Sequence, residues 1–345
     1  MLALYRRAAT LYYFRSSRAK RPPLPAPFRM FRRLSSSALF GVLALMSTAC
    51  LPGGGRRAYT AQLTPEPAVR VYDTKARGFV PFRQFADAIA SRDLVFFGEQ
   101  HNDPTTHAAE HAVLAALGER RSHVVLTLEM FERDVQSLVD RYIAGAISEK
   151  DFLAGARPWD NYPSDYRPMV ELARVRGWPV IAANVPRRLA SAVSRRGLAV
   201  LDTMNARDRG YVAKQNVCPK DTYYEKFAET MKGHSAGGGP PTAADMAAMA
   251  QMTDRFYEAQ CVKDEAMGEA IADAFSRAPK GTVVFQVDGA FHSDFGLGTV
   301  ERAKRRLPKA SSVIITAVPV ADLAKPDTEP HATKADYVIF TRAPK

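Results

Sequence analysis

The stretch DLVFFGEQH, from Asp93 to His101, decides the fold that the sequence predicts. Its first six residues form a short apolar run, which is typical of a strand buried on both faces of a parallel sheet. Residues 103–117 then predict a helix, because Asp103 can cap the first turn and Pro104 suits the first helical position. A buried strand followed by a helix is the repeating unit of an α/β fold.

The same alternation continues to the end of the chain. Further strands are predicted at residues 123–128, 179–183, 282–287, 311–318 and 337–341. Further helices are predicted at residues 133–144, 168–176, 187–195 and 242–277, the last of them long enough to be kinked or split. We therefore expect one α/β domain over residues 71–345, with a mainly parallel mixed sheet flanked by helices.

The positive charge of the chain is concentrated near its start. Nine of the 48 Lys and Arg residues, and none of the 36 Asp and Glu residues, lie in residues 1–49, so the formal net charge of +12 falls to about +3 for the rest. A basic leader is typical of a targeting segment. The nearly neutral remainder lacks the electrostatic footprint of a nucleic-acid-binding protein, so we expect no nucleic-acid partner.

Within this leader, the residues from Met30 onward resemble a bacterial lipoprotein signal. An apolar run over residues 37–46 has the length of a signal-peptide core, and Ser-Thr-Ala then precedes Cys50 as in a lipobox, although Ser47 stands where leucine is usual. We expect residues 1–49 to be a leader that functionally starts at Met30, and Cys50 to be lipidated. The protein would then be exported and held at a membrane by its lipid, in the periplasm or at the cell surface. A short uncleaved anchor is the alternative.

Two further features fit an exported chain. Residues 50–70 are rich in Gly and Pro and predict a flexible tether between the membrane and the domain. The cysteines that follow Cys50 are Cys218 and Cys261, which in an oxidising compartment could form a disulfide. Two buried thiols are the alternative, and the sequence does not choose between them.

Polar residues stand where the predicted strands end. Because ligands bind outside the carboxyl ends of the strands in an open parallel sheet, we expect these side chains to share one rim. Two or more carboxylates with two imidazoles suit a divalent metal, and they equally suit general acid–base catalysis. The alternative is that each side chain only hydrogen-bonds a nearby loop. The rim residues are Glu99, His101, Glu129, Asn184 and His292, of which Glu99, His101, Glu129 and His292 are the predicted metal ligands, and Glu99, His101 and His292 are the catalytic residues of a hydrolase.

Two helical patterns carry further candidate residues. Residues 107–111, HAAEH, match the inverted zinc-protease pattern, in which two histidines share one face of a helix. Of these, His107 is the better pocket residue, because it lies near the start of the helix, whereas His111 lies deeper. On the long helix, Gln260 and Asp264 fall on an apolar face, so we expect them to face the pocket or to pair with a neighbouring element.

Several motifs together resemble one protein family. The segment 98–101 with His107, the residues 128–131, the aromatic segment 159–168, the residues 183–187 and the Gln260–Met267 region follow the order seen in the ChaN-type haem-binding-uptake lipoproteins. The resemblance covers roughly residues 80–320. The sequence departs from the family pattern at Asp288, an added charge before the Gly-x-x-His turn, and at His111, where glutamine is expected.

The resemblance implies an α/β fold with a Glu/His pocket and a role in haem and iron uptake. Haem requires an axial donor, apolar walls and cations for its propionates. The resemblance places haem at a dimer interface or in an open pocket, with Tyr or His as the axial ligand. The candidate haem-binding residues are Tyr162, Tyr166, Arg187 and His107.

The wider group to which this family belongs, with the TraB, Tiki and erythromycin esterase proteins, implies another activity. In these relatives a similar pocket hydrolyses peptides or esters. A metal-dependent or His-based hydrolase acting on a small molecule or peptide is therefore the alternative function, with a divalent metal as the alternative cofactor.

Overall fold

In the computed structural model, which describes residues 68–232 and 242–343, the apolar run after Asp93 forms strand β3, Leu94–Glu99. β3 lies within an eight-stranded sheet whose order is β2-β1-β8-β7-β3-β6-β4-β5. The strands from β8 to β5 pair in parallel, and β1 pairs antiparallel with both β2 and β8. The mainly parallel mixed sheet predicted from the sequence is confirmed.

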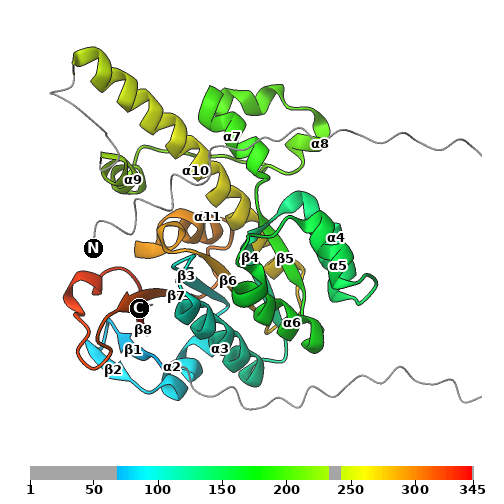
Figure 1. Ribbon diagram of the computed structural model, residues 1–345, viewed down its shortest axis with the longest axis vertical. Helices are drawn as coiled ribbons and strands as arrows, with labels where there is room; N and C mark the ends of the chain where they lie inside the picture. The colour runs from blue at the N-terminus through cyan, green and yellow to red at the C-terminus, as the bar shows by residue number, and fades with distance from the viewer. Residues whose placement is uncertain (1–67, 233–241, 344–345) are drawn as a thin grey trace, which may run out of the picture. The chain divides into compact units, whose positions relative to one another are not determined.

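Helices cover both faces of this sheet (Figure 1). Val95 and Phe97 of β3 join an apolar cluster with residues of α2 and α3, whereas Leu94 and Phe96 pack on the other face with residues of α10 and α11. Successive side chains of a strand point to opposite faces, so an uninterrupted apolar run is what a strand between two helical layers requires. β3 is therefore buried along its whole length.

The predicted strands are present with small shifts of their ends. They are β4, Val124–Glu132; β5, Val180–Asn184; β6, Val283–Gly289; β7, Ser312–Val320; and β8, Tyr337–Arg342. The predicted helices are α3, Pro104–Arg120; α4, Gln136–Ile143; α6, Arg167–Arg176; α7, Arg187–Arg196; and α10, Ala243–Arg277. α10 is a single helix of 35 residues that starts in a capping box between Thr242 and Asp245.

Several short elements were not predicted. They are β1, Arg70–Asp73; β2, Gly78–Val80; α2, Phe82–Ala90; α5, Glu149–Ala156; α8, Ala206–Arg209; α9, Thr222–Lys232; and α11, Gly298–Arg306. β4 also runs four residues further than expected, because Met130 and Phe131 continue its apolar run after a shift in its pairing with β5. Glu129 therefore lies inside the extended strand and not after it.

The predicted leader and Cys50 lie outside the described residues. Of the tether predicted at residues 50–70, the last residue, Arg70, starts β1. Among the helices of the described ranges, none combines the length and the apolar content that a membrane crossing requires.

Candidate functional site

The carboxyl ends of three neighbouring strands form one polar rim. Glu99, at the end of β3, lies beside Gly289, at the end of β6, in the parallel register. β4 pairs with the other edge of β6, and its Glu129 accepts a hydrogen bond from the backbone N–H of Gly289 at 2.9 Å. The parallel register thus brings together residues that are up to 190 positions apart in the chain.

His101 is the imidazole of the rim that reaches solvent. Its Nδ1 lies 2.5 Å from Oε1 of Glu99, and 44% of its side chain is exposed. The ring also meets the indole of Trp159 edge to face, with 4.8 Å between ring centroids. Burial alone would lower the pKa of His101, but the Glu99 carboxylate outweighs it and the pKa lies above its ordinary value.

His292 is buried between two carboxylates. Its Nδ1 lies 2.7 Å from Oδ1 of Asp264, and its Nε2 lies 3.4 Å from Oε1 of Glu129. Burial lowers its pKa, yet Glu129 and Asp264 together raise it to about 10. The raised pKa favours the imidazolium form of His292, which suits this residue to stabilising negative charge or donating a proton more than to acting as a base.

Asp264, on α10, holds His292 and also hydrogen-bonds residues of α9 and α11. Its carboxylate is fully buried and accepts hydrogen bonds from the hydroxyl of Tyr223 at 2.9 Å and from Thr299 at 3.0 Å, besides its contact with His292. Nε2 of Gln260 lies 3.2 Å from both ring nitrogens of His292. Gln260 and Asp264 therefore both contact the rim residue His292, and Asp264 also pairs with the neighbouring helices α9 and α11, so each of the two alternatives left by the sequence holds in part.

The site has two parts. The outer rim contains the pairs Glu99 with His101 and Glu129 with His292, and an inner group lies behind it. The inner group consists of Glu99, His107 and Glu110, all buried. Nδ1 of His107 lies 2.9 Å from Oε2 of Glu110 and 3.7 Å from Oε2 of Glu99. Burial and the neighbouring Glu99 carboxylate raise the pKa of Glu110 well above its ordinary value.

The structure distributes the predicted metal ligands between these groups. Within residues 68–232 and 242–343, the set with donor atoms within 4.8 Å of one another is Glu99, His107 and Glu110. The predicted set of Glu99, His101, Glu129 and His292 lines the rim as two pairs, Glu99 with His101 and Glu129 with His292, that meet at Gly289. Metal binding by these four residues stays a prediction.

The aromatic segment 159–168 closes one side of the rim. Asn161 donates hydrogen bonds to the carbonyl of His101 at 2.8 Å and to Asp165 at 2.7 Å, which fixes the segment to the turn after β3. Residues Tyr162–Tyr166 form a π-helical turn, an irregularity that is frequent at functional sites. Trp159 is half-buried there and lies against both His101 and Tyr166.

The two tyrosines predicted to bind haem are buried. The hydroxyl of Tyr166 donates to Oε1 of Glu99. Tyr162 packs against Phe131 and Phe152, and its hydroxyl has no hydrogen-bond partner among the described residues. Both tyrosines are 1% exposed, so they lie in the interior and not at the surface. Their role as haem ligands stays a prediction.

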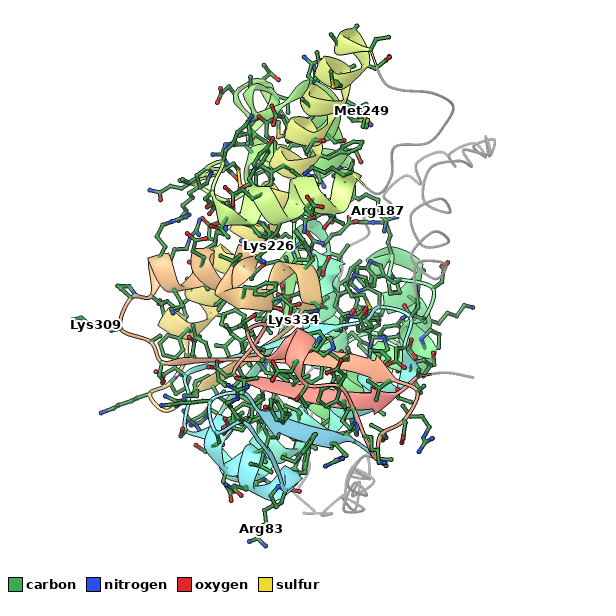
Figure 2. All side chains as sticks on the ribbon, turned by 90° about the vertical axis from the view of Figure 1, so that its left-hand side faces the viewer. Arg83, Arg187, Lys226, Met249, Lys309 and Lys334 are labelled. Atoms are coloured by element: carbon green, nitrogen blue, oxygen red, sulfur yellow. A yellow bond between two sulfur atoms is a disulfide. The ribbon has the colours of Figure 1, made fainter. Side chains whose placement is uncertain are left out.

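Two other predicted residues lie further along the sheet. Asn184 ends the edge strand β5, where it pairs with Glu132 of β4. Arg187 starts α7 and is exposed on the molecular surface (Figure 2). The structure therefore brings Glu99, His101, Glu129 and His292 together, with Asn184 and Arg187 one strand beyond them.

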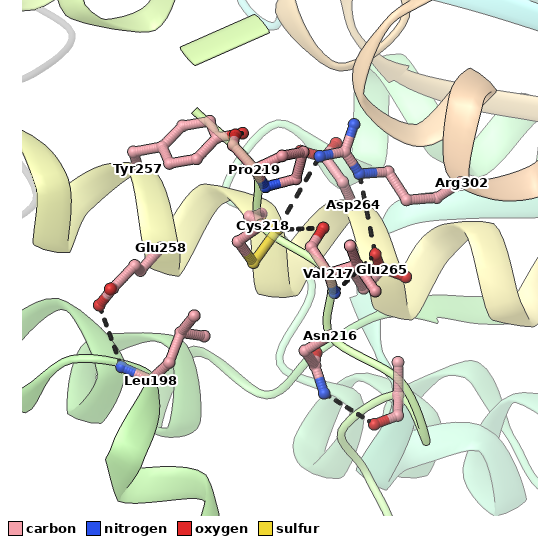
Figure 3. Close-up of a disulfide and its surroundings, with 12 residues drawn as sticks. Leu198, Asn216, Val217, Cys218, Pro219, Tyr257, Glu258, Asp264, Glu265 and Arg302 are labelled. Carbon is pink, nitrogen blue, oxygen red and sulfur yellow. Dashed lines mark hydrogen bonds and ion pairs between the residues drawn. A yellow bond between two sulfur atoms is a disulfide. The ribbon is translucent and has the colours of Figure 1, made fainter. Parts of the chain in front are cut away.

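A disulfide joins the segment before α9 to α10. Cys218 and Cys261 are bonded, which confirms the first of the two alternatives left by the sequence (Figure 3). Cys261 lies one helical turn before Asp264, and Tyr223 follows Cys218 by five residues. The disulfide therefore fixes to α10 the segment that supplies the Tyr223 hydroxyl to Asp264.

Sequence patterns did not identify every residue of the site. Tyr223 and Thr299 lie on α9 and α11, two short helices with a mixture of polar and apolar residues, and their contact with Asp264 arises only when those helices pack on α10. The HAAEH pattern is a sequence signal for two members of the inner group. His107 and Glu110 belong to it, whereas the third member is Glu99 and not His111.

Comparisons with known proteins agree with this architecture. The sequence matches a protein family described as haem-binding uptake, Tiki superfamily, ChaN, over residues 85–303. The structure is similar to one described as cofacial haem binding to ChaN of Campylobacter jejuni, with a TM-score of 0.56 and 13% identity over 80% of this chain and 97% of that chain. At this identity, the likeness to the solved structure shows the fold alone.

Two more solved structures match the chain with lower TM-scores. The type III effector HopBA1 has a TM-score of 0.40 and 12% identity, over 81% of this chain and 99% of that chain. An erythromycin esterase, EreC, in its open conformation has a TM-score of 0.39 and 12% identity, over 76% of this chain and 80% of that chain. No curated protein sequence matches the chain.

Proposed function

The chain belongs to the haem-binding uptake, ChaN family of the Tiki superfamily, and from this we propose that it binds haem and serves in haem or iron uptake. The family match over residues 85–303 is the observation that carries the proposal, because it includes the complete rim from Glu99 to His292. The solved ChaN structure, described by its cofacial haem, supports the same ligand.

The residues of the rim fit haem on an open face. His101 combines an exposed imidazole with a carboxylate on its Nδ1, and an imidazole held in this way is a suitable axial ligand for haem iron. Trp159 supplies an apolar wall beside it. When bound, haem would supply the iron and its redox chemistry, whereas the chain positions the imidazole and shields one side of it.

A second copy of the chain would complete such a site. His101 and Trp159 lie together on an exposed face, where 44% of the His101 side chain is open to solvent. We therefore propose that haem lies against His101 and Trp159 and is covered by a second protomer.

Haemin titration of the purified protein tests this proposal. We expect a shifted, saturable Soret band, and a roughly tenfold or larger loss of affinity in His101→Ala, because this substitution removes an axial ligand. His123→Ala is the matched control, since His123 is an exposed histidine at the opposite end of β4. The spectrum of free haemin with wild-type protein, or equal losses in both variants, would contradict the proposal.

The proposed location is a membrane surface outside the cytoplasm. We propose that Cys50 carries the lipid and that residues 51–67 connect it to the domain. The Cys218–Cys261 disulfide supports export, because disulfides persist in oxidising compartments. Growth with an alkyne-tagged fatty acid is expected to label the wild-type protein and not Cys50→Ala. Equal labelling of both proteins would show that the lipid is attached to another residue. No labelling of either protein would show that the chain carries no such lipid.

Hydrolysis is the second candidate function. Two features favour it. The exposed imidazole of His101 is paired with Glu99, and the buried imidazole of His292, whose pKa is raised, lies on the same rim. In that arrangement His101 would activate water, with Glu99 holding the imidazole, and His292 would stabilise the negative charge that develops. A screen of ester and peptide substrates tests it. Activity that survives in both His101→Ala and His292→Gln would remove these residues from the mechanism.

A further inference from the structure

The inner group behind the rim has the composition of a metal site. We propose that Glu99, His107 and Glu110 bind one divalent transition-metal ion, such as Zn²⁺, inside the domain. The proposal does not depend on haem binding, and it concerns a different set of residues from the rim ligands predicted above. Two of its ligands come from the HAAEH pattern on α3, and the third comes from the end of β3.

The first argument is the spacing of the donor atoms. Bonds of about 2.0–2.2 Å in a tetrahedral zinc site place neighbouring ligand atoms about 3.4 Å apart. Nδ1 of His107 lies 2.9 Å from Oε2 of Glu110 and 3.7 Å from Oε2 of Glu99, distances that bracket this value. All three donors lie within 4.8 Å of one another, so a local rearrangement of the side chains would bring them into one coordination sphere.

The second argument is that two buried carboxylate oxygens have no partner. Oε2 of Glu99 and Oε1 of Glu110 lack a hydrogen bond among the described residues, although their side chains are 1% and 0% exposed. An unpaired buried carboxylate oxygen is costly, and buried charges are normally paired or bound to a metal. A divalent cation bound by Oε2 of Glu99 and by the Glu110 carboxylate would give the Glu99 oxygen a partner and neutralise the two carboxylates.

The third argument is the orientation of His107. Its Nε2 lies 3.2 Å from the carbonyl oxygen of His101 and 3.5 Å from Oδ2 of Asp165, two acceptors that suit a ring N–H donor. Its Nδ1 faces the carboxylates of Glu110 and Glu99, the side on which the ion would bind. A metal-binding histidine almost always donates its other ring N–H to a carbonyl or carboxylate in this way.

The fourth argument is the orientation of Glu99. Its Oε1 accepts from the Tyr166 hydroxyl and contacts Nδ1 of His101, which leaves Oε2 directed at His107. The two carboxylate oxygens of Glu99 thus have different partners: Oε1 contacts the rim, and Oε2 faces the inner group. Tyr166 and His101 would support the metal ligand without touching the ion.

Elemental analysis of the haem-free protein tests this site. Because the three ligands are buried, the protein is unfolded in guanidinium with a chelator and refolded with or without Zn²⁺, followed by dialysis. We expect roughly one zinc ion per chain and a higher Tm after refolding with zinc. Glu110→Gln and His107→Gln are expected to lose most of the bound zinc.

Two controls separate this site from the rim and from misfolding. His111→Ala removes the neighbouring histidine of the same pattern, and His292→Gln removes the buried rim histidine; both are expected to keep the zinc. A cobalt-loaded protein should show visible d–d absorption that Glu110→Gln loses while its far-ultraviolet circular dichroism is unchanged. No zinc in the wild-type protein, or zinc lost from His292→Gln and retained by Glu110→Gln, would overturn the proposal.

Discussion

The imidazole of His101 rests against the bare Cα of Gly289: a Cβ added to Gly289 would stand 2.7 Å from Nε2 of His101. The Gly289 N–H also donates to Glu129, so this one residue separates the two carboxylate–histidine pairs of the rim. A side chain at this position would push the pairs apart.

Gly289→Ala is therefore expected to displace His101 and to weaken haem binding, by roughly tenfold if His101 is the axial ligand. The backbone φ of Gly289 is −56°, so alanine introduces a steric conflict and no backbone strain. Haemin titration measures the effect. Gly78→Ala is the control, because the nearest atom to its added Cβ is 3.9 Å away. Unchanged affinity in Gly289→Ala would show that haem does not depend on the His101 position.

Asp264→Asn is expected to lower the pKa of His292 from about 10. The substitution keeps the shape of the side chain and removes one of the two carboxylates that hold the imidazolium. A titration of the His292 ring protons by nuclear magnetic resonance, with chelator present, measures the pKa directly. Asp254→Asn on the same helix is the control, because Asp254 pairs with Lys220 and Tyr224 outside the site.

The same pair predicts how stability depends on pH. Because the pKa of His292 is raised from 6.5 to about 10 on folding, its contribution to the free energy of unfolding is complete below pH 6.5 and is lost as the pH rises through 10. Urea unfolding of the metal-free protein at both ends of this window should show a smaller pH-dependent loss in Asp264→Asn than in the wild type. Equal losses would contradict the assignment.

Breaking the disulfide is expected to destabilise the domain and to loosen α9. Cys218 and Cys261 are separated by 43 residues, and closing a loop of that length contributes up to about 4 kcal/mol. The doubly substituted protein, Cys218→Ser with Cys261→Ser, should lose about 2–4 kcal/mol of unfolding free energy and exchange the amide hydrogens of α9 faster. Reduced wild-type protein should behave in the same way, and a difference between the two would point to the serines themselves.

Glu265 is a buried acid on which the packing of α11 against α10 depends. It is fully buried, and its carboxylate binds Arg305 at 2.6 Å and Arg306 at 2.6 Å. Glu265→Gln leaves these guanidinium groups without their counter-charge, so we expect a loss of about 3 kcal/mol in urea unfolding. Asp273→Asn on the same helix should cost less than about 1 kcal/mol, because both members of its pair with Arg277 are exposed. Similar costs for both would show that burial does not set the energy here.

Tyr162→Phe distinguishes a core tyrosine from a haem ligand. Because the Tyr162 hydroxyl is buried without a partner among the described residues, its removal should leave the domain as stable or up to about 1 kcal/mol more stable. The haem spectrum should not change. A lost or shifted charge-transfer band in this variant would show instead that Tyr162 reaches the iron, as the family resemblance suggests.

The strands of the sheet were predictable because of their burial. β3, β6 and β4 lie between two helical layers, so each is an apolar run that ends in a polar residue, and this pattern is visible in the sequence. β1 and β2 have four and three residues and pair at one edge of the sheet, where partial exposure leaves no such run. β2 pairs with β1, and the hydrogen bonds of β1 with β8 depend on a chain segment more than 260 residues away.

The candidate site was predictable at its rim and not in its interior. Strand order and parallel register place Glu99 beside the end of β6, and therefore near the turn that carries His292, independently of side-chain conformation. The inner contact of Glu99 with His107 and Glu110 depends on how α3 packs and on which carboxylate oxygen faces it. A pattern of residue types carries no such information, which is why the HAAEH pattern pointed to His111, and not to Glu110, as the partner of His107.

The donors at the rim come from three neighbouring strands and the turns that follow them, and the spacing between the strands is set by backbone hydrogen bonds and not by the side chains. Substituting one donor residue is therefore expected to change the chemistry at that position while the other donor residues keep their positions. Such a scaffold can exchange ligands one substitution at a time, which offers a practical route for engineers to retune the rim from capturing a cofactor to cleaving a bond.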